Sequence, residues 1–461
     1  MTFVARLRPG PPPRWAKPRR ELLLLALCAV AALSTVNLFN VQDQSRFCLT
    51  DALSHGALTI DRCIGATKER SRYGGHLYAN KAPGMSLLAL PAALVVGYAP
   101  TPQIHQSVGA RLWAVRLFAC GLPFLLLVFL VGRVCESISA GTGAPALVTF
   151  ALGTAVAPFA AVGFDHLPAA AFGFAAFVLA WRRRPLLAGL AAGAALLCEY
   201  EAAAIVGIVG VYAALFGVRA LARYSLGLLP GAVLLLAYDW AAFGAPWRTP
   251  LAYSDNEYRA IHTSGIFGVH LPNLHSIRLV FIGSGGLLVI SPVLLAAAVG
   301  LVLLWRRGLR AEAATCTLVT LAFVLAEAGY GDPYGGDSPL PRYLIPALPF
   351  LAVGLAPAFR RLRIPTTLLA AVSIVAMTTV TATWTMVMYH GYPDGIWSLL
   401  ARVPSDGRYS WIAIHFAPNA LNWLGASSLL AGTTACLAAL TAFVLSLERD
   451  PSPSVAALPA L

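Results

Sequence analysis

Long apolar runs recur along almost the whole chain, and they constrain its fold more than any other feature of the sequence. A run of about 20 apolar residues crosses the roughly 30 Å hydrocarbon core of a bilayer as one helix. Hydrophobic residues make up 58% of the 461 residues and charged residues only 11%, whereas soluble domains carry roughly 25% charged residues. So few charges cannot cover a soluble surface of this size. The sequence therefore predicts an all-α polytopic membrane protein.

The apolar runs predict about 12 or 13 transmembrane helices in a single domain over residues 21–446. A basic head at residues 1–20 and a short tail at residues 447–461 flank this domain. A shorter run at 85–98 contains Pro91, and we interpret it as a re-entrant or interfacial segment. The predicted spans lie near residues 21–39, 111–132, 144–163, 167–181, 186–199, 202–217, 225–243, 286–304, 312–329, 343–358, 364–388 and 420–446.

Clusters of basic residues predict the orientation of these spans. Cytoplasmic loops carry an excess of Lys and Arg. If the N-terminus is cytoplasmic, the basic head, the run Arg182–Arg184 and the cluster around Arg360 all lie inside, as does the tail. This arrangement also accounts for the net charge of +13. Since no basic run interleaved with aromatic residues lies outside the spans, nucleic-acid binding is not expected.

Most of the acidic residues then lie on the outer side, where three segments, 40–110, 244–285 and 389–419, are long enough to build a site. Long segments of this kind in compact proteins usually carry function. Apolar residues from Ser45 to Leu58 recur at a helical spacing, which predicts a helix lying on the membrane surface. Cys48 and Cys63 share this region and either form a disulfide in an oxidising compartment or remain free thiols.

Two acidic residues follow spans on the outer side and are candidate catalytic groups. Asp43 comes after the first span. Asp165 follows the third span, and His166 beside it is a candidate substrate-binding residue. A carboxylate at this boundary can accept a proton from a hydroxyl, and a pair of carboxylates suits chemistry at an anomeric carbon. Each has a structural alternative: Asp43 stabilises a helix dipole and Asp165 caps the following helix. Asp43, Asp165 and His166 show no tight spacing of metal ligands, so no metal cofactor is expected.

Candidate phosphate-binding residues flank the apolar segments on the same side. Lys81 stands in a Pro- and Gly-containing turn that begins at Tyr78, with Arg72 upstream, and Arg342 precedes Tyr343 at the start of a late span. Lys and Arg bind phosphate through charge-assisted hydrogen bonds. The alternatives are that Lys81 snorkels to the interface and that Arg342 is a boundary anchor.

Glu199 and Glu201 interrupt an apolar stretch at the outer end of the fifth span. Ionisable residues inside membrane segments are costly and usually functional. These two are expected either to bind sugar hydroxyls or to form a structural ion pair.

Taken in order, these motifs resemble the GT-C membrane glycosyltransferases, in particular the group with the protein O-mannosyltransferases and the lipid A aminoarabinose transferase. The resemblance covers roughly residues 20–360. The matching strings are Asp43-Gln44-Ser45-Arg46-Phe47, Asn80-Lys81-Ala82-Pro83-Gly84, Ala110-Arg111-Leu112, Phe164-Asp165-His166 and Pro341-Arg342-Tyr343.

The resemblance implies a GT-C-like fold and a polyprenyl-phosphate sugar donor used at the outer face of a bacterial inner membrane. The acceptor would be a hydroxyl on a glycan, lipid or protein. It implies that Asp43 is the catalytic carboxylate and Asp165 the second acid, with Lys81 and Arg342 on the lipid phosphate. We expect an inverting displacement. The alternative is a flippase or transporter for a lipid-linked sugar, but such proteins commonly carry repeated halves, and no repeat is visible in this sequence.

Overall fold

The computed structural model describes most of the chain between residues 7 and 448. The described residues are 7, 9–13, 19–34, 41–63, 65, 67–98, 100, 110–256, 259–266, 268–332, 334–335, 338, 340–382, 397 and 428–448. The predicted outer segment 389–419, apart from residue 397, and almost all of the predicted tail lie outside this part of the chain.

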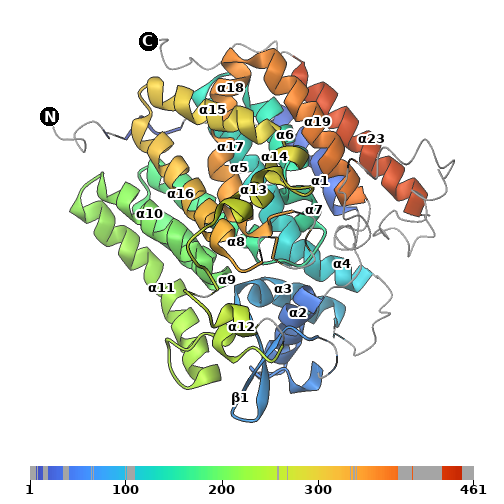
Figure 1. Cartoon of the computed structure of the whole chain (residues 1–461), viewed down its shortest axis with the longest axis vertical. Helices are drawn as coiled ribbons and strands as arrows, with labels where there is room; N and C mark the ends of the chain where they lie inside the picture. Colours follow the sequence, from blue (N-terminus) through green and yellow to red (C-terminus); the bar gives the residue numbers. More distant parts are fainter. Residues whose placement is uncertain are drawn as a thin grey trace.

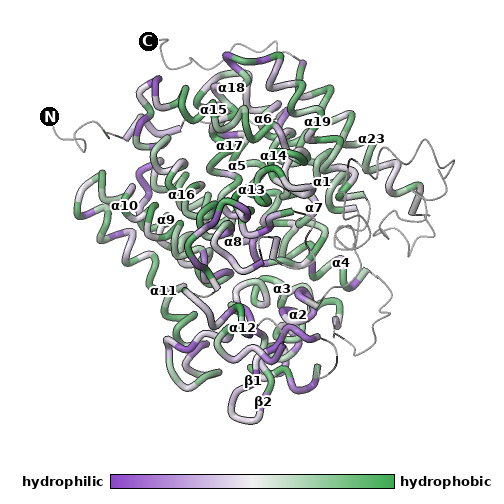
Figure 2. The backbone as a smooth tube through the Cα atoms, viewed as in Figure 1, coloured by the Kyte–Doolittle hydropathy of each residue, from purple (hydrophilic) through white to green (hydrophobic). Residues whose placement is uncertain are grey.

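The described part is a helical body with a smaller polar lobe at one end, which holds α2, α12 and β1 in Figure 1. Hydrophobic residues dominate the body, and polar residues gather in the lobe and at the helix ends (Figure 2). The fold is therefore the predicted all-α membrane class, because the apolar runs form helices. The body comprises α1 (Arg19–Leu33), α4 (Ala110–Arg116), η3 (Leu117–Gly121), α5 (Leu122–Ile138), α6 (Gly143–Gly153), α7 (Val156–Ala160), α8 (His166–Trp181), α9 (Pro185–Cys198), η4 (Tyr200–Ala202), α10 (Ala203–Ala214), α11 (Val218–Phe243), α13 (Leu274–Ile282), α14 (Leu287–Ile290), α15 (Val293–Arg306), α16 (Arg310–Gly329), η6 (Arg342–Ala347), α17 (Leu348–Ala352), α18 (Leu355–Arg361), α19 (Arg363–Ala382) and α23 (Ser428–Leu447).

Among the described residues, five helices are long and apolar enough to span a membrane unaided, and two bent pairs bring this number to seven. Five further apolar helices are shorter, including α8 and α9. Several predicted spans are thus broken: the run at 286–304 bends by 91° before α15, and that at 343–358 bends by 54° before α18. A break in a helix leaves backbone N–H and C=O groups without their helical hydrogen bonds. Membrane proteins tolerate such groups only where the break is buried in protein or lines a cavity.

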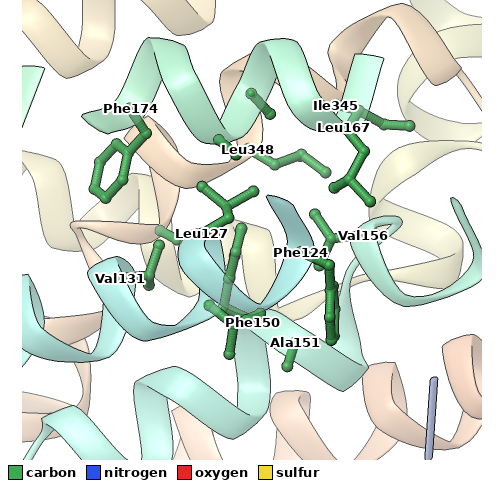
Figure 3. Close-up of a cluster of buried hydrophobic side chains, with 14 of the residues drawn as sticks. Phe124, Leu127, Val131, Phe150, Ala151, Val156, Leu167, Phe174, Ile345 and Leu348 are labelled. Carbon is green, nitrogen blue, oxygen red and sulfur yellow. The ribbon is translucent and has the colours of Figure 1, made fainter. Parts of the chain in front are cut away.

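The core of the body is a continuous set of buried apolar side chains contributed by segments far apart in the sequence. Phe124 and Leu127 of α5 meet Phe150 of α6, Leu167 of α8 and Ile345 of η6 in the cluster drawn in Figure 3. Burying an aliphatic or aromatic side chain of this size in a soluble core contributes about 1.5–3 kcal/mol. Within a bilayer the surrounding lipid is itself apolar, so close van der Waals packing replaces much of this hydrophobic contribution. The cluster therefore fixes α5, α6, α8 and η6 against one another.

The polar lobe is built mainly from the first outer segment. It holds α2 (Val41–Ser54), η2 (Asp61–Cys63), the antiparallel pair β1 (Arg70–Tyr73) and β2 (His76–Ala79), and α3 (Gly84–Val96). The second outer segment adds η5 (Pro250–Tyr253) and α12 (Arg259–His262), and an isolated bridge joins Ser71 to Ser254. The sequence did not predict the two-stranded hairpin.

The interpretation of α2 as a helix on the membrane surface is wrong. Residues 42–50 are all buried within the protein. The helix packs against α3 and the hairpin. Of the two alternatives left open for Cys48 and Cys63, the structure shows the disulfide, which joins the helix to η2. Its polar side chains are therefore turned into the protein, where each needs a partner.

Candidate active site

A pocket lies where α2, the turn before α3, the breaks around α8 and α9, and the start of η6 meet. Its lining is unusually rich in charge for the interior of a membrane protein. The lining residues are Gln42, Arg46, Asn80, Lys81, Ala82, Asp165, His166, Glu199, Tyr200, Glu201, Leu251, Arg342 and Tyr343.

Close backbone packing brings these segments together. A Cβ at Gly84 would lie 2.5 Å from the carbonyl oxygen of Leu197, so glycine lets the start of α3 touch the end of α9. This contact sets the turn carrying Lys81 beside the turn carrying Glu199. A Cβ at Gly163 would lie 2.5 Å from the Cβ of Asp43, which likewise brings α2 against the turn before Asp165.

Asp165 forms a buried ion pair with Arg46. The Nη2 atom of Arg46 lies 2.6 Å from Oδ1 of Asp165, and both side chains are almost fully buried. Burial raises the pKa of Asp165, but the charges of Arg46, His166 and Lys81 and the hydrogen bond from Arg46 together outweigh this effect and hold the pKa below its ordinary value. Asp165 occupies the N-cap position of α8 without a capping hydrogen bond from its side chain. The capping alternative is therefore wrong, and Asp165 lines the pocket.

Asp43 lies beside the pocket but does not line it. Its side chain is fully buried and pairs with Arg116, whose Nε donates to Oδ2 of Asp43 at 3.1 Å. Gln42 and Arg46, on the same helix, do line the pocket. Of the four residues to which the resemblance assigns catalysis or phosphate binding, Lys81, Asp165 and Arg342 therefore share one pocket, and Asp43 lies in the adjoining wall.

Glu199 is the second carboxylate of the pocket, and it is paired with His166. Nδ1 of His166 is hydrogen-bonded to Oε1 of Glu199, while Oε2 of Glu199 is buried and has no hydrogen-bond partner. Burial, followed by the charge of Asp165, raises the pKa of Glu199 well above its ordinary value. Glu201 also lines the pocket but is exposed to it. The sequence predicted all three residues as binding groups, and the structure places all three in the lining.

Lys81 and Arg342 supply positive charge to the same cavity. Arg342 is buried, with its guanidinium 5.0 Å from the ring centre of Phe164 and 5.2 Å from that of Tyr343. Such stacking orients the planar group. Because Arg342 is enclosed by protein, the alternative of an anchor at the membrane boundary is wrong. Lys81 is half-buried and lines the pocket.

A further polar layer supports Lys81 from the side of the lobe. Glu69 is buried and accepts a hydrogen bond from Nδ2 of Asn80. Nδ1 of His262 lies 3.1 Å from Oγ of Ser254. Burial, followed by the charge of Lys81, lowers the pKa of His262 to about 4.

Two predicted binding residues lie elsewhere. Arg72 is exposed on β1 and pairs with Asp255 at 3.0 Å. Tyr78 belongs to the apolar cluster of the lobe, with its ring centre 5.1 Å from that of Phe243. Neither lines the pocket. Strand alternation accounts for part of this, because successive side chains of a hairpin point to opposite faces.

Sequence reasoning missed roles for Arg46, Arg116 and Tyr200. Arg116 had a usable signal, since it is an ionisable residue inside an apolar run. Arg46 lies one helical turn after Asp43 and so shares its face, but the surface-helix interpretation hid that relation. Tyr200 lines the pocket, and its hydroxyl donates to Asp239 at 2.8 Å.

Asp165, His166 and Glu199 also form the one group of three potential metal ligands found within the described residues. One ligand atom from each lies within 4.8 Å of the others. The sequence considered Asp43 in this role, but Arg116 already pairs with that carboxylate.

Comparisons with known proteins give structural matches alone. No protein-family profile matches the chain, and no curated protein matches its sequence. The apo structure of ArnT from Cupriavidus metallidurans superposes with a TM-score of 0.54 at 15% identity, over 93% of this chain and 75% of that chain. The same enzyme bound to undecaprenyl phosphate gives a TM-score of 0.53 at 16% identity, over 94% and 77% of the two chains.

The oligosaccharyltransferase of Archaeoglobus fulgidus, in its apo form, gives a TM-score of 0.48 at 13% identity, over 93% of this chain and 56% of that chain. The match to ArnT extends over nearly the whole chain, so it concerns the overall arrangement of helices rather than one motif. The chain thus shares its overall fold with ArnT.

Proposed function

We propose that this protein transfers a sugar, a hexose or a pentose, from a polyprenyl-phosphate donor to a hydroxyl acceptor on a glycan, lipid or protein. The observation that carries this proposal is the pocket itself, in which three cations and three carboxylates line one cavity inside an apolar helical body. Buried charges are costly unless they are paired or used. A lipid-linked sugar phosphate presents groups that match both kinds of charge.

The cations form the phosphate end of the pocket in this proposal. Lys81 and Arg342 would contact the lipid phosphate, with Arg46 held on α2 by Gln42, whose backbone oxygen accepts from Nη1 of Arg46 at 2.6 Å. Arg binds phosphate through its planar fork and Lys as a point charge. The solved ArnT structure with undecaprenyl phosphate supports a lipid phosphate as the ligand of this fold.

The carboxylates would bind the sugar and assist the transfer. The acceptor oxygen attacks the anomeric carbon, the bond from that carbon to the phosphate oxygen breaks, and the phosphate leaves with the electron pair. The acceptor proton passes to a carboxylate, and the configuration inverts. Asp165, His166, Glu199 and Glu201 line the cavity where the sugar hydroxyls would lie.

Asp43 is the proposed base, in a state in which the acceptor hydroxyl replaces Arg116 as its partner. Arg116 stabilises the ionised form of Asp43, which is the form that a base needs. Glu201 is the rival base, because it already lines the pocket. Separate Asp43→Asn and Glu201→Gln variants decide between them: we expect the first to abolish transfer and the second to retain measurable turnover. Transfer by Asp43→Asn at the wild-type rate would remove Asp43 from the mechanism.

Two observations support a pocket on the outer face of the membrane. Helices α8, α9 and α16 each place one end near the pocket, and the opposite end of each lies beside basic residues, which include Arg182, Arg184 and Arg310. By the positive-inside rule those basic ends are cytoplasmic. The disulfide of the adjoining lobe fits an oxidising compartment. We therefore propose a bacterial inner-membrane protein with a cytoplasmic N-terminus.

The test is to incubate purified protein in lipid vesicles with radiolabelled polyprenyl-phosphate sugars and a panel of hydroxyl acceptors. Release of polyprenyl phosphate together with a new labelled glycoside supports transfer. Unchanged donor that has crossed the vesicle membrane supports the flippase alternative. The proposal is contradicted if folded protein shows neither transfer nor transport with any of the donors.

A further inference from the structure

Asn80 is fully buried and lines the pocket, but only one side of its amide group is occupied. Its Nδ2 atom donates a hydrogen bond to Oε2 of Glu69. Its Oδ1 atom is buried and has no hydrogen-bond partner among the described residues. Buried polar atoms are normally paired with the protein or with a bound molecule. Oδ1 of Asn80 is therefore available to a ligand in the pocket.

Glu69 determines which side of this amide stays available. It is buried just before β1, and its backbone N–H donates to Oγ1 of Thr67 at 3.0 Å. An ionised carboxylate accepts hydrogen bonds and donates none. The amide of Asn80 therefore turns its amino group toward Glu69, which leaves the carbonyl oxygen for the pocket. The pocket offers an acceptor at this position and so requires a hydrogen-bond donor on the ligand.

The acceptor oxygen lies at the phosphate end of the pocket. Lys81 follows Asn80 in a bend of the chain, and both residues line the pocket. In the proposed function Lys81 contacts the lipid phosphate, one oxygen of which is bonded to the anomeric carbon. The sugar hydroxyl nearest to that bond is on the adjacent carbon, carbon 2. A neutral amide suits this place, because a carboxylate would pair with Lys81 and compete with the phosphate.

We propose that Asn80, held in one orientation by Glu69, accepts a hydrogen bond from the carbon-2 hydroxyl of the donor sugar. Asn80 is then a specificity-determining residue, and Glu69, which acts through it, is a positioning residue. The inference rests on the proposed function and narrows its substrate class to sugars with a free hydroxyl at carbon 2. A 2-deoxy sugar would leave Oδ1 of Asn80 buried and unpaired, which a site built for a hydrogen bond penalises.

The test compares donors that differ by this one oxygen atom. The donors are polyprenyl-phosphate glucose, mannose and arabinose, each measured beside its 2-deoxy counterpart. The readout is the ratio of kcat/KM for the sugar to kcat/KM for the 2-deoxy sugar. Because each variant is compared with the wild type through this ratio, the intrinsic reactivity of the two donors cancels. A purely structural role of Asn80 would lower both rates equally and leave the ratio unchanged.

The ratio should fall by about 10- to 100-fold from the wild type to Asn80→Ala, because the acceptor oxygen is removed. Glu69→Gln keeps the shape of the side chain, but its amide can donate as well as accept. The amide of Asn80 is then no longer held in one orientation, and the ratio should fall by about threefold or more.

The matched control is Asn256→Ala, which removes the same side chain from a position outside the lining and should keep the wild-type ratio. Thermal unfolding checks that each variant is folded, and if Asn80→Ala is not, Glu69→Gln decides alone. A wild-type ratio in folded Asn80→Ala overturns the proposal, and one in Glu69→Gln overturns the positioning role of Glu69. Either result leaves the proposed function standing, whereas the absence of transfer from every donor rejects that function and this inference with it.

Discussion

Two buried carboxylate regions at opposite ends of the helical body differ in what surrounds them. Asp165 and Glu199 line a cavity together with three cations. Glu312, at the basic end of α16, is equally buried, but its Oε1 atom accepts from the hydroxyl of Tyr212 and the backbone N–H of Gly10, each at 2.8 Å. It is not in the lining of the pocket.

The difference shows that burial of charge alone does not mark a functional site. Glu312 fastens the N-terminal segment to the body by hydrogen bonds within the protein, helped by Trp181, whose indole N–H donates to the carbonyl of Pro11 at 2.9 Å. The carboxylates at the other end line the pocket and face its open volume. Charges that converge on a cavity are available to a ligand, whereas charges satisfied by the fold contribute to stability.

The largest expected effect is on transfer when the phosphate end of the pocket loses a cation. Arg342→Met and Lys81→Met should each lower kcat/KM by about 10²–10³-fold, the cost of removing one preorganised donor from a transition state. Single-turnover assays with a labelled donor measure it. Arg72→Met is the control: Arg72 lies outside the pocket and pairs with Asp255, so transfer should be unchanged. An equal loss in the control would show that the pocket has been assigned wrongly.

The next effect is on the lobe that carries α2. Removing the Cys48–Cys63 disulfide by Cys48→Ser should lower the free energy of unfolding by about 3 kcal/mol, because the bond closes a loop of about 15 residues. Denaturant titration under non-reducing conditions measures this change. Cys436→Ser is the control, since Cys436 is an exposed free thiol. Equal stability of the wild type and Cys48→Ser would show that the disulfide does not hold the lobe.

A smaller effect on stability is expected at the opposite end of the helical body, where Glu312 lies. The comparison predicts that Glu312 contributes to folding stability and not to catalysis. Glu312→Gln should cost about 1–2 kcal/mol of unfolding free energy, because an amide replaces a charged hydrogen-bond acceptor. Its transfer rate should equal that of the wild type. A drop in kcat without a drop in melting temperature would break the distinction drawn between the two regions.

The smallest effect concerns pH and the layer behind Lys81. Burial lowers the pKa of His262 to about 4 from its usual 6.5. Between these two pH values the imidazole of His262 is protonated in the unfolded chain and neutral in the folded chain. The contribution of His262 to stability is therefore lost as pH falls from about 6.5 to 4. Lys81 and Arg342 lower this pKa further, and Glu69 opposes them. The melting temperature of His262→Gln should fall less over this window than that of the wild type; equal slopes would exclude this role.

The sequence predicted the fold class because apolar runs and basic clusters are local signals that the bilayer imposes. It also predicted Asp165, His166, Glu199 and Glu201 in the lining, since ionisable residues at span ends are rare enough to stand out. The breaks in the spans were harder to predict, because each depends on close contacts such as that between Gly84 and Leu197.

What the sequence could not predict was which charges meet. Arg46 pairs with a residue 119 positions further along the chain, and Arg116 with one 73 positions earlier. Such partners follow from the packing of α2 inside the lobe, whereas the helical spacing of α2 fits a surface helix equally well. Arg72 was misplaced for a related reason, because the hairpin that carries it was not recognised.

The most direct test of the account is the affinity of the purified protein, in lipid nanodiscs, for undecaprenyl phosphate. Wild-type protein should bind the lipid saturably, and the double variant Lys81→Met and Arg342→Met should lose about 100-fold or more in affinity, since two charge-assisted contacts of about 1.5–3 kcal/mol each are removed. The Arg72→Met variant should bind as the wild type does. If the double variant binds the lipid as tightly as the wild type, this pocket does not hold the phosphate.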